Sequence, residues 1–203
     1  MNEGPDEQLA RRVKAELRKR MRGLRKTAPL AACQERSREI RERLASLEVV
    51  KDAQRVALFW PIEDKHEVDL RPLDTTLRGR GVQIAYPAID PDTGVMTFRF
   101  ASPDELEEAG FGFSEPPVSA PEADELDLVV VPALAVAPTG HRLGYGAGYY
   151  DRTLPRFRPP ASAVVVAFEY QLLMEVPATP TDVACDYVVT DKRVLAVSVE
   201  TAR

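Results

Sequence analysis

The sequence predicts an α/β protein, with an open, mostly parallel twisted sheet between two helical layers. Short apolar runs alternate along the chain with segments of helical periodicity, which favours parallel strands joined by helices. The run at 128–132 is apolar throughout, as expected of a parallel strand covered on both faces. A chain of 203 residues, 44% of them hydrophobic, is long enough for one domain whose core needs no disulfide or structural metal.

The first fifty residues are predicted to form two helices. Apolar side chains recur every three or four positions on one face of the first helix, at Leu9, Val13, Leu17, Met21 and Leu24. Basic side chains recur at the same spacing on another face, at Lys14, Arg18, Arg22 and Arg25. Pro29 separates this helix from a second one, with inward positions at Ala32, Ile40, Leu44 and Leu47. We expect 1–50 to be a basic helical segment that packs on an α/β core at 51–203 within a single domain.

The core is predicted to hold six or seven strands. The strand candidates are 55–60, 81–87, 95–100, 128–132, 163–168 and one or two within 187–199, with a helix at 70–80. Residues 101–127 carry nine acids, four prolines and no Lys or Arg, which indicates an irregular surface excursion. This alternation is typical of Rossmann-like three-layer sandwiches, in which ligands bind beyond the carboxyl ends of the strands. The loops of interest therefore follow Trp60, Pro132 and Phe168.

Charge and composition exclude several classes. The net charge of −5 argues against general nucleic-acid binding, although 1–60 carries 15 basic and 9 acidic residues and could meet an anion. No apolar run approaches the ~20 residues of a membrane span, and no signal-peptide core follows the first Met. The two cysteines, Cys33 and Cys185, form no CxxC pair. We expect a cytoplasmic monomer with reduced thiols that acts on small molecules.

The segment GHRLGYGAGYYDR at 140–152 is the most informative motif. It follows a buried strand and enters a predicted helix, so its glycines can turn backbone N–H groups toward an anion. It is neither a Walker A motif nor a dinucleotide fingerprint, because it lacks the Lys-Ser/Thr pair and the third glycine. Arg142 and Arg152 flank the glycines and Asp151 follows them, which suits a magnesium-bound polyphosphate better than a merely mobile loop.

Six signals together resemble the 5-formyltetrahydrofolate cyclo-ligase family, in order and over nearly the whole chain. They are Lys14-x-x-Leu17-Arg18, Glu67-Val68-Asp69, the sequence RLGYGAGYYDR at 142–152, Gln171, Asp182 and the sequence DYVVT at 186–190. Two positions depart from the family pattern. Ala147 stands where many members have glycine, which a negative φ would tolerate. Thr181 stands where the family often has His, which puts a role for an imidazole there in doubt.

The resemblance implies ATP- and Mg²⁺-dependent cyclisation of 5-formyltetrahydrofolate to 5,10-methenyltetrahydrofolate. It implies an ATP site at Lys14, Arg18, Arg142, Leu143, Gly144, Tyr145, Gly146, Ala147, Gly148, Tyr149, Tyr150 and Arg152. The folate would meet Trp60, Glu67, Tyr145, Gly146, Ala147, Gly148 and Tyr149. Asp151 and Asp182 would ligate Mg²⁺, which binds one or two carboxylates besides phosphate oxygens.

Other interpretations remain at this stage. A sugar-phosphate isomerase or a CoA-transferase-like enzyme on a similar sheet would also bind phosphate through a glycine-rich loop, without ATP or Mg²⁺. A non-enzymatic protein could use the basic helix on RNA or on an acidic partner. Among single residues, Trp60 could be a core aromatic, Arg22 and Arg25 could belong to a solvated helix face, and at least one of Tyr149 and Tyr150 is expected only to pack.

Overall fold

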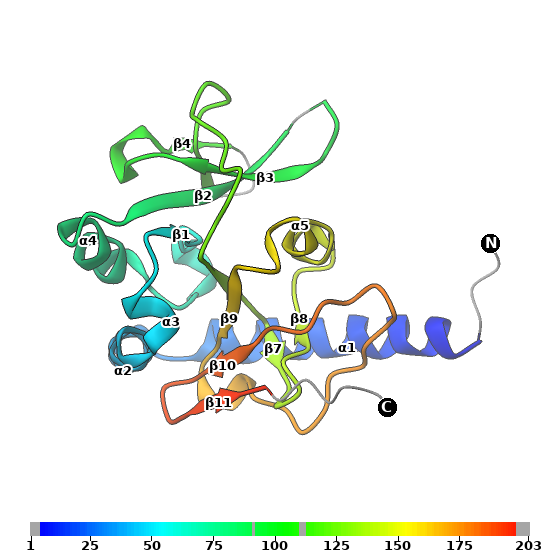
Figure 1. The fold of residues 1–203 in the computed structure, drawn as a ribbon. Helices are drawn as coiled ribbons and strands as arrows, with labels where there is room; N and C mark the ends of the chain where they lie inside the picture. The colour runs from blue at the N-terminus through cyan, green and yellow to red at the C-terminus, as the bar shows by residue number, and fades with distance from the viewer. Residues whose placement is uncertain (1–4, 91, 110–112, 198–203) are drawn as a thin grey trace.

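The computed structural model describes residues 5–90, 92–109 and 113–197. Its centre is a seven-stranded sheet in the order β11-β10-β9-β6-β1-β2-β3, with helices on both faces (Figure 1). The strands are β1 Arg55–Ala57, β2 Gln83–Ile89, β3 Met96–Phe100, β6 Leu128–Pro132, β9 Ser162–Val166, β10 Tyr187–Val189 and β11 Val194–Ala196. The five central strands are parallel, and the edge strands β3 and β11 are antiparallel to their neighbours.

Alternate residues of the buried strands face two separate cores. Val56 and Val130 belong to the core beneath α2 Leu30–Ser46, α3 Glu48–Lys51 and α4 Arg71–Gly79. Ala57 and Val131 face the opposite core, beneath α5 Tyr149–Phe157. Since both faces of the central strands are covered, their continuous apolar runs follow directly from the layered architecture.

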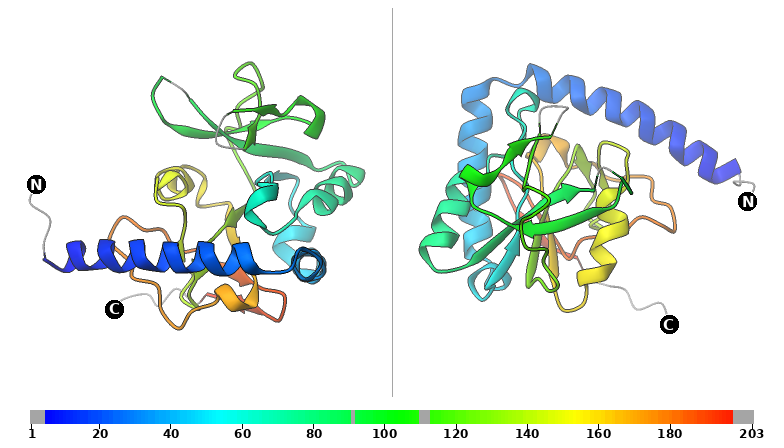
Figure 2. Two further views of the ribbon diagram at one scale, coloured as in Figure 1. Left: turned by 180° about the vertical axis from the view of Figure 1, so that it is seen from behind. Right: turned by 90° about the horizontal axis from the view of Figure 1, so that it is seen from above.

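The long helix α1 Pro5–Thr27 lies across the loops at one end of the sheet, and its first turns project beyond the rest of the chain (Figures 1 and 2). Met21 is 1% exposed and packs with Leu134 and Leu143. Leu134 directly precedes, and Leu143 ends, the small hairpin of β7 Ala135–Val136 and β8 Arg142–Leu143. Packing of the apolar stripe on this hairpin brings the basic stripe of α1 to the glycine-rich loop.

The order in which the chain adds strands to the sheet reverses between β1 and β6, which are adjacent parallel strands. From β1 it continues to β2 on one side, whereas from β6 it continues to β9 on the other. The loops that leave these adjacent parallel strands diverge, which opens a crevice at their carboxyl ends. The loop after β1 carries Glu67, and the loop after β6 leads to the glycine-rich motif.

The predicted three-layer α/β sandwich is confirmed. The acidic excursion at 101–127 contains more structure than the sequence predicts, namely the short turn η2 Pro103–Glu105 and a hairpin of β4 Glu107–Glu108 and β5 Ser114–Glu115. Strands of two residues such as β7, β8, β4 and β5 are too short to give a periodic signal. Within the described ranges, each helix is either too short or too polar to cross a bilayer.

Candidate active site

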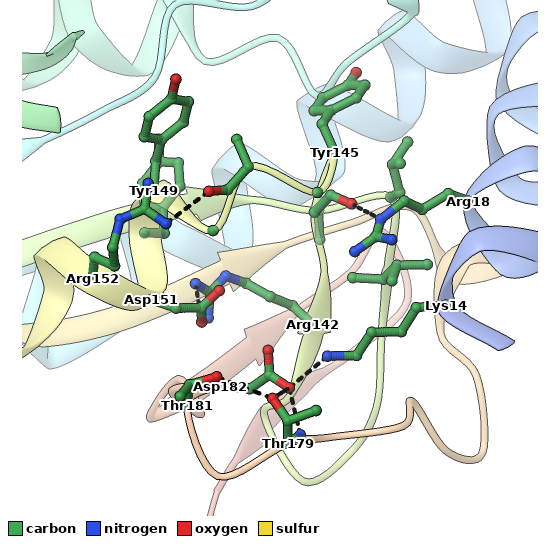
Figure 3. A pocket seen from close by; sticks show the side chains of 18 of the residues that line it. Lys14, Arg18, Arg142, Tyr145, Tyr149, Asp151, Arg152, Thr179, Thr181 and Asp182 are labelled. Atoms are coloured by element: carbon green, nitrogen blue, oxygen red, sulfur yellow. Dashed lines mark hydrogen bonds and ion pairs between the residues drawn. The ribbon is translucent and has the colours of Figure 1, made fainter. Parts of the chain in front are cut away.

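A cavity of about 830 Å³ lies at the loop after β6, one of the three loops expected at the site, and its size is typical of small-molecule sites (Figure 3). Among the described residues, neither the loop after Trp60, which carries Glu67, nor the loop after Phe168 contributes to its lining, so the expected convergence of three loops on one cavity is not found. Four segments border it: α1, the loop after β6, the glycine-rich loop and a loop near the C-terminal end of the described chain. Its lining residues are Arg11, Lys14, Arg18, 132–134, 142–152 and 179–182. All the nucleotide-site and metal-site residues that the sequence predicts are therefore brought together around one cavity.

The glycine-rich loop depends on left-handed backbone at two glycines. Gly146 has φ 116° and Gly148 has φ 68°. Between them, Ala147 avoids positive φ, since His66 is the one non-glycine residue with positive φ in the described chain. The expectation that alanine is tolerated at 147 is thus confirmed. Gly148 is the N-cap of α5, so the free N–H groups and positive end of this helix lie beside the loop.

Arginines from two helices hold the loop. The Nε atom of Arg18 on α1 donates to the carbonyl of Gly144 at 3.0 Å. The Nη1 atom of Arg152 on α5 donates to the carbonyl of Ala147 at 2.8 Å. A Cβ atom added to Gly146 would lie 3.4 Å from the Arg18 guanidinium, which is an ordinary contact, so the positive φ is what favours glycine at this position. The loop is therefore set by its glycines and by cations from outside it.

Lys14 and Asp182 form a partly buried ion pair. The Lys14 Nζ atom lies 2.5 Å from Oδ2 of Asp182, which also accepts hydrogen bonds from the backbone N–H and hydroxyl of Thr179 (Figure 3). Burial alone would raise the pKa of Asp182, but the hydrogen bonds from Lys14 and Thr179 outweigh it and hold this pKa below its ordinary value. Asp182 is thus an ionised carboxylate already paired with the cation predicted to meet phosphate.

Arg142 and Asp151 form a second pair close to the first. The Arg142 Nη2 atom donates to Oδ1 of Asp151 at 2.9 Å, and its Nη1 donates to the carbonyl of Val183 at 2.6 Å. The backbone N–H of Val183 donates to the same Asp151 oxygen at 3.0 Å. Since Val183 follows Asp182 directly, these contacts bring the two predicted metal ligands into one neighbourhood.

Asp151 is the third residue of α5, and Gly148 occupies its N-cap position. Asp151 is therefore not the N-cap residue of α5.

The residues present fit a magnesium ion that arrives with phosphate. Asp151 Oδ2 and Asp182 Oδ1 accept no hydrogen bond within the described chain, so each carboxylate keeps one oxygen available. The same ranges contain no cluster of three or more His, Cys, Asp or Glu side chains that could hold a metal by itself. Two carboxylates beside a polyphosphate are the donor set that Mg²⁺ ordinarily uses.

On the other side of the glycine-rich loop, Glu67 is held by a chain of hydrogen bonds. The Tyr145 hydroxyl donates to Glu67 Oε1 at 2.9 Å and accepts a hydrogen bond from Arg25. The backbone N–H of Ile62 donates to Oε2 at 2.9 Å. Glu67 is therefore on the same side of the domain as the loop, as predicted. We call this set the Glu67 side, and the pairs of Lys14 with Asp182 and Arg142 with Asp151 the Asp182 side.

Arg25 corrects one interpretation. It is 4% exposed, whereas a solvated helix face would leave it in water; Arg22 is exposed as that interpretation predicts. The helical spacing from Lys14 and Arg18 already placed Arg25 on the same face. Thr179 was also missed, and a lone threonine in a loop carries no signal that could have found it.

Trp60 does not line the cavity. It packs against the core beneath α2 and α4 and meets Tyr86 edge to face, with ring centroids 5.9 Å apart. Gln171 also lies outside the lining, but its Nε2 donates to the carbonyls of Ala133 at 3.2 Å and Leu134 at 2.8 Å. The loop after β9 therefore supports the cavity from behind, through the loop after β6.

The remaining predicted residues differ in how they face the cavity. Leu143 is 1% exposed and belongs to the core under α1. Tyr150 packs near Phe98, and burial is the main cause that raises its pKa. The Tyr149 ring carries the Arg152 guanidinium 5.4 Å from its centroid. Figure 3 shows the rings of Tyr145 and Tyr149 pointing to the opposite side of the loop from Asp151 and Asp182.

Known proteins that are similar to this chain in sequence or in structure share one description. Residues 10–191 match the model of the 5-formyltetrahydrofolate cyclo-ligase family. A 5-formyltetrahydrofolate cyclo-ligase of Mycolicibacterium smegmatis is 33% identical over 91% of this chain and 97% of that protein. The Escherichia coli K12 cyclo-ligase is 29% identical over 79% of this chain and 91% of its own length. The solved 5,10-methenyltetrahydrofolate synthetase of Aquifex aeolicus superposes with a TM-score of 0.79 at 31% identity, covering 94% of this chain and 98% of that one. The chain belongs to the 5-formyltetrahydrofolate cyclo-ligase family of ligases.

Proposed function

We propose that this enzyme uses ATP and Mg²⁺ to cyclise 5-formyltetrahydrofolate to 5,10-methenyltetrahydrofolate, with release of ADP and phosphate. The observation that carries the proposal is the position of the glycine-rich loop between two different environments. Its Asp182 side offers cations and two carboxylates, and its Glu67 side offers a buried carboxylate beside aromatic rings. A site that joins a polyphosphate to a pterin needs one of each.

The Asp182 side suits the triphosphate. Lys14, Arg18, Arg142 and Arg152 lie around the loop, and the N-terminus of α5 adds its N–H groups. Phosphoryl transfer asks a protein mainly for positioning and for neutralisation of negative charge. Bound Mg²⁺ would supply further neutralisation there, held by the available oxygens of Asp151 and Asp182. In exchange, Lys14 and Arg142 would turn from these carboxylates toward phosphate oxygens.

The Glu67 side suits the folate. A carboxylate has about four lone-pair sites, and two donors occupy only part of this capacity at Glu67. The rest can accept the amide-like N–H groups of a pterin ring. Tyr145 and Tyr149 offer flat faces beside it, and Tyr145 is 39% exposed. Trp60 is proposed only at the margin of this site, because it packs on the core.

The reaction needs ATP for a chemical reason. The formyl oxygen attacks the terminal phosphorus of ATP, and the bond to the bridging oxygen of ADP breaks. The N10 nitrogen of the folate then attacks the activated formyl carbon and loses its proton. The carbon–oxygen bond breaks, and phosphate leaves with the former formyl oxygen. An amide oxygen is a poor leaving group, whereas phosphate is a good one.

We extend the proposal to the organisation of the chain: residues 1–203 work as one domain, of which the basic segment 1–50 is a working part. Burial of Met21 of α1 and the contact of Lys14 with Asp182 support this, because removal of α1 would open both the core and the cavity.

The test is the absorbance of the methenyl-folate product in mixtures of enzyme, 5-formyltetrahydrofolate, ATP and Mg²⁺, with one component left out at a time. We expect product only in the complete mixture, with one ADP released per product. Product formed without ATP, or isomerisation of a sugar phosphate or turnover of an acyl-CoA in its place, would overturn the proposal.

A further inference from the structure

Arg25 is a buried cation that the proposed reaction does not use directly. Its guanidinium donates to the Tyr145 hydroxyl, lies 5.6 Å from the centroid of the Tyr145 ring, and has its Nη2 atom 3.6 Å from Glu67 Oε1. The side chains of Arg25 and Glu67 are each 5% exposed. The two charges are thus joined through a hydroxyl rather than by a direct hydrogen bond.

The direction of donation along these hydrogen bonds is fixed. Guanidinium has only donors, so the Tyr145 oxygen must accept from Arg25 and give its single proton to Glu67. Burial and the Glu67 charge raise the pKa of Tyr145, which keeps that proton in place. With Ile62 donating to the second oxygen, the carboxylate plane of Glu67 has one favoured orientation.

The hydrogen bonds from Arg25 through Tyr145 to Glu67 also connect three segments that are distant in sequence: α1, the loop after β1 and the glycine-rich loop. The backbone carbonyl of Arg25 adds a contact with the His66 ring, whose Nδ1 lies 3.2 Å away. A buried ion pair contributes little to stability relative to apolar side chains of similar volume, so orientation is the better account of its presence. The two loops that these contacts orient, the loop after β1 and the glycine-rich loop, lie on either side of the point where the order of strand addition reverses.

We propose that Arg25 is a positioning residue for the folate: through Tyr145 it fixes the orientation of Glu67 and ties this carboxylate to the glycine-rich loop. The inference rests on the proposed function. It predicts that loss of the Arg25 charge weakens folate binding and the alignment of the formyl oxygen, while ATP binding on the Asp182 side stays intact.

The main variant is Arg25→Gln, compared with Arg20→Gln on an exposed face of the same helix. We expect Arg25→Gln to lower kcat/KM for the folate by about 10- to 100-fold, the size typical of a small misplacement at a reacting centre, with an unchanged KM for ATP. Arg25→Lys, which keeps the charge, should recover part of the loss. Arg20→Gln should match the unmodified enzyme in both constants.

The contrast between the two substrates separates positioning from general damage. Glu67 faces Arg25 of α1 and Tyr145 of the glycine-rich loop, and Lys65 and His66 adjoin it in its own loop. Because the contacts of Arg25 lie on the Glu67 side, its loss should disturb that side alone. Equilibrium binding of the folate should therefore weaken in Arg25→Gln and less in Arg25→Lys, while equilibrium binding of ATP should not change.

Tyr145→Phe keeps the inference testable if Arg25→Gln unfolds, as thermal denaturation would reveal. It removes the connecting hydroxyl and should also reduce folate binding selectively. Equal loss of ATP and folate binding in a folded variant, or unchanged folate binding in Arg25→Gln, would overturn the inference. Unmodified enzyme that binds the folate but forms no methenyl product would overturn the proposed reaction instead, and the binding titrations of the variants would still decide the role of Arg25.

Discussion

On the Asp182 side of the glycine-rich loop, opposite charges touch each other directly, at 2.5 Å for Lys14 with Asp182 and 2.9 Å for Arg142 with Asp151. On the Glu67 side, the Tyr145 hydroxyl lies between the charges. Under the proposed function, the direct pairs neutralise a site that exchanges partners when ATP and Mg²⁺ bind, because phosphate and metal would compete for the same side chains. The Glu67 network leaves acceptor capacity on the carboxylate, so a ligand can add to it. The glycine-rich loop thus borders one site whose ion pairs would be exchanged on binding and one site whose carboxylate is already oriented for a ligand.

Of the substitutions on the Asp182 side, the one that removes the Asp151 charge should reduce turnover most. Asn keeps the shape of Asp and can still accept from Arg142 and Val183, but it cannot hold a cation as a carboxylate does. We expect Asp151→Asn to lower turnover at saturating ATP and Mg²⁺ by about 100-fold, in the range found for loss of preorganised charge stabilisation. Thermal unfolding of the same sample is the control. A folded Asp151→Asn enzyme with full turnover would remove Asp151 from the metal site.

The loop itself is tested by glycine substitutions. Gly146→Ala places a side chain at φ 116°, and backbone strain of this kind costs about 1–3 kcal/mol. We expect apparent ATP affinity to fall by about tenfold or more. Gly144→Ala is the matched control, because a Cβ atom there meets nothing within 4 Å. Equal effects of the two substitutions would show that the backbone at Gly146 is not what matters.

Lys14→Ala probes the exchange of partners. Loss of a charge-assisted contact to phosphate should weaken ATP binding by about 1.5–3 kcal/mol, measured as the apparent KM for ATP at saturating folate. Arg12→Ala, at an exposed position of the same helix, is the control for net charge. If both variants keep the unmodified ATP requirement, Lys14 contacts only Asp182 and no phosphate.

The smallest effect concerns stability against pH. The pKa of Asp182 lies below its ordinary value, so its ion pair stabilises the folded state at neutral pH and this contribution is lost as pH falls through the lowered pKa. The free energy of unfolding of Asp182→Asn should be lower than that of the unmodified protein at pH 7, by at most about 1 kcal/mol because the pair is partly solvated. Urea titrations from pH 7 down to pH 3 should show this difference shrinking below about pH 4. A difference that grows toward acid would contradict the assignment.

Local pattern predicted the layers, since continuous apolar runs such as 128–132 mark a buried strand wherever its partners lie. The family resemblance predicted that the cavity residues belong to one site, and the structure places them around one cavity. The partners of these residues could not be predicted. Arg25 looks like its exposed neighbour Arg22 in sequence, and only tertiary packing decides that one is buried beside Tyr145. Trp60 likewise ends an apolar run that serves either a core or a cavity.

The pair of Lys14 and Asp182 joins residues 168 positions apart, so the cavity is completed by segments distant in sequence. A ribosome releases α1 long before the Thr179–Asp182 loop. The nascent protein therefore carries its basic helix without its acidic counterpart until that loop emerges. Contacts so far apart in sequence also form late in folding, because loop closure costs entropy before the contact repays it. Under the proposed function, ATP can be bound only after both segments have been synthesised and have folded together.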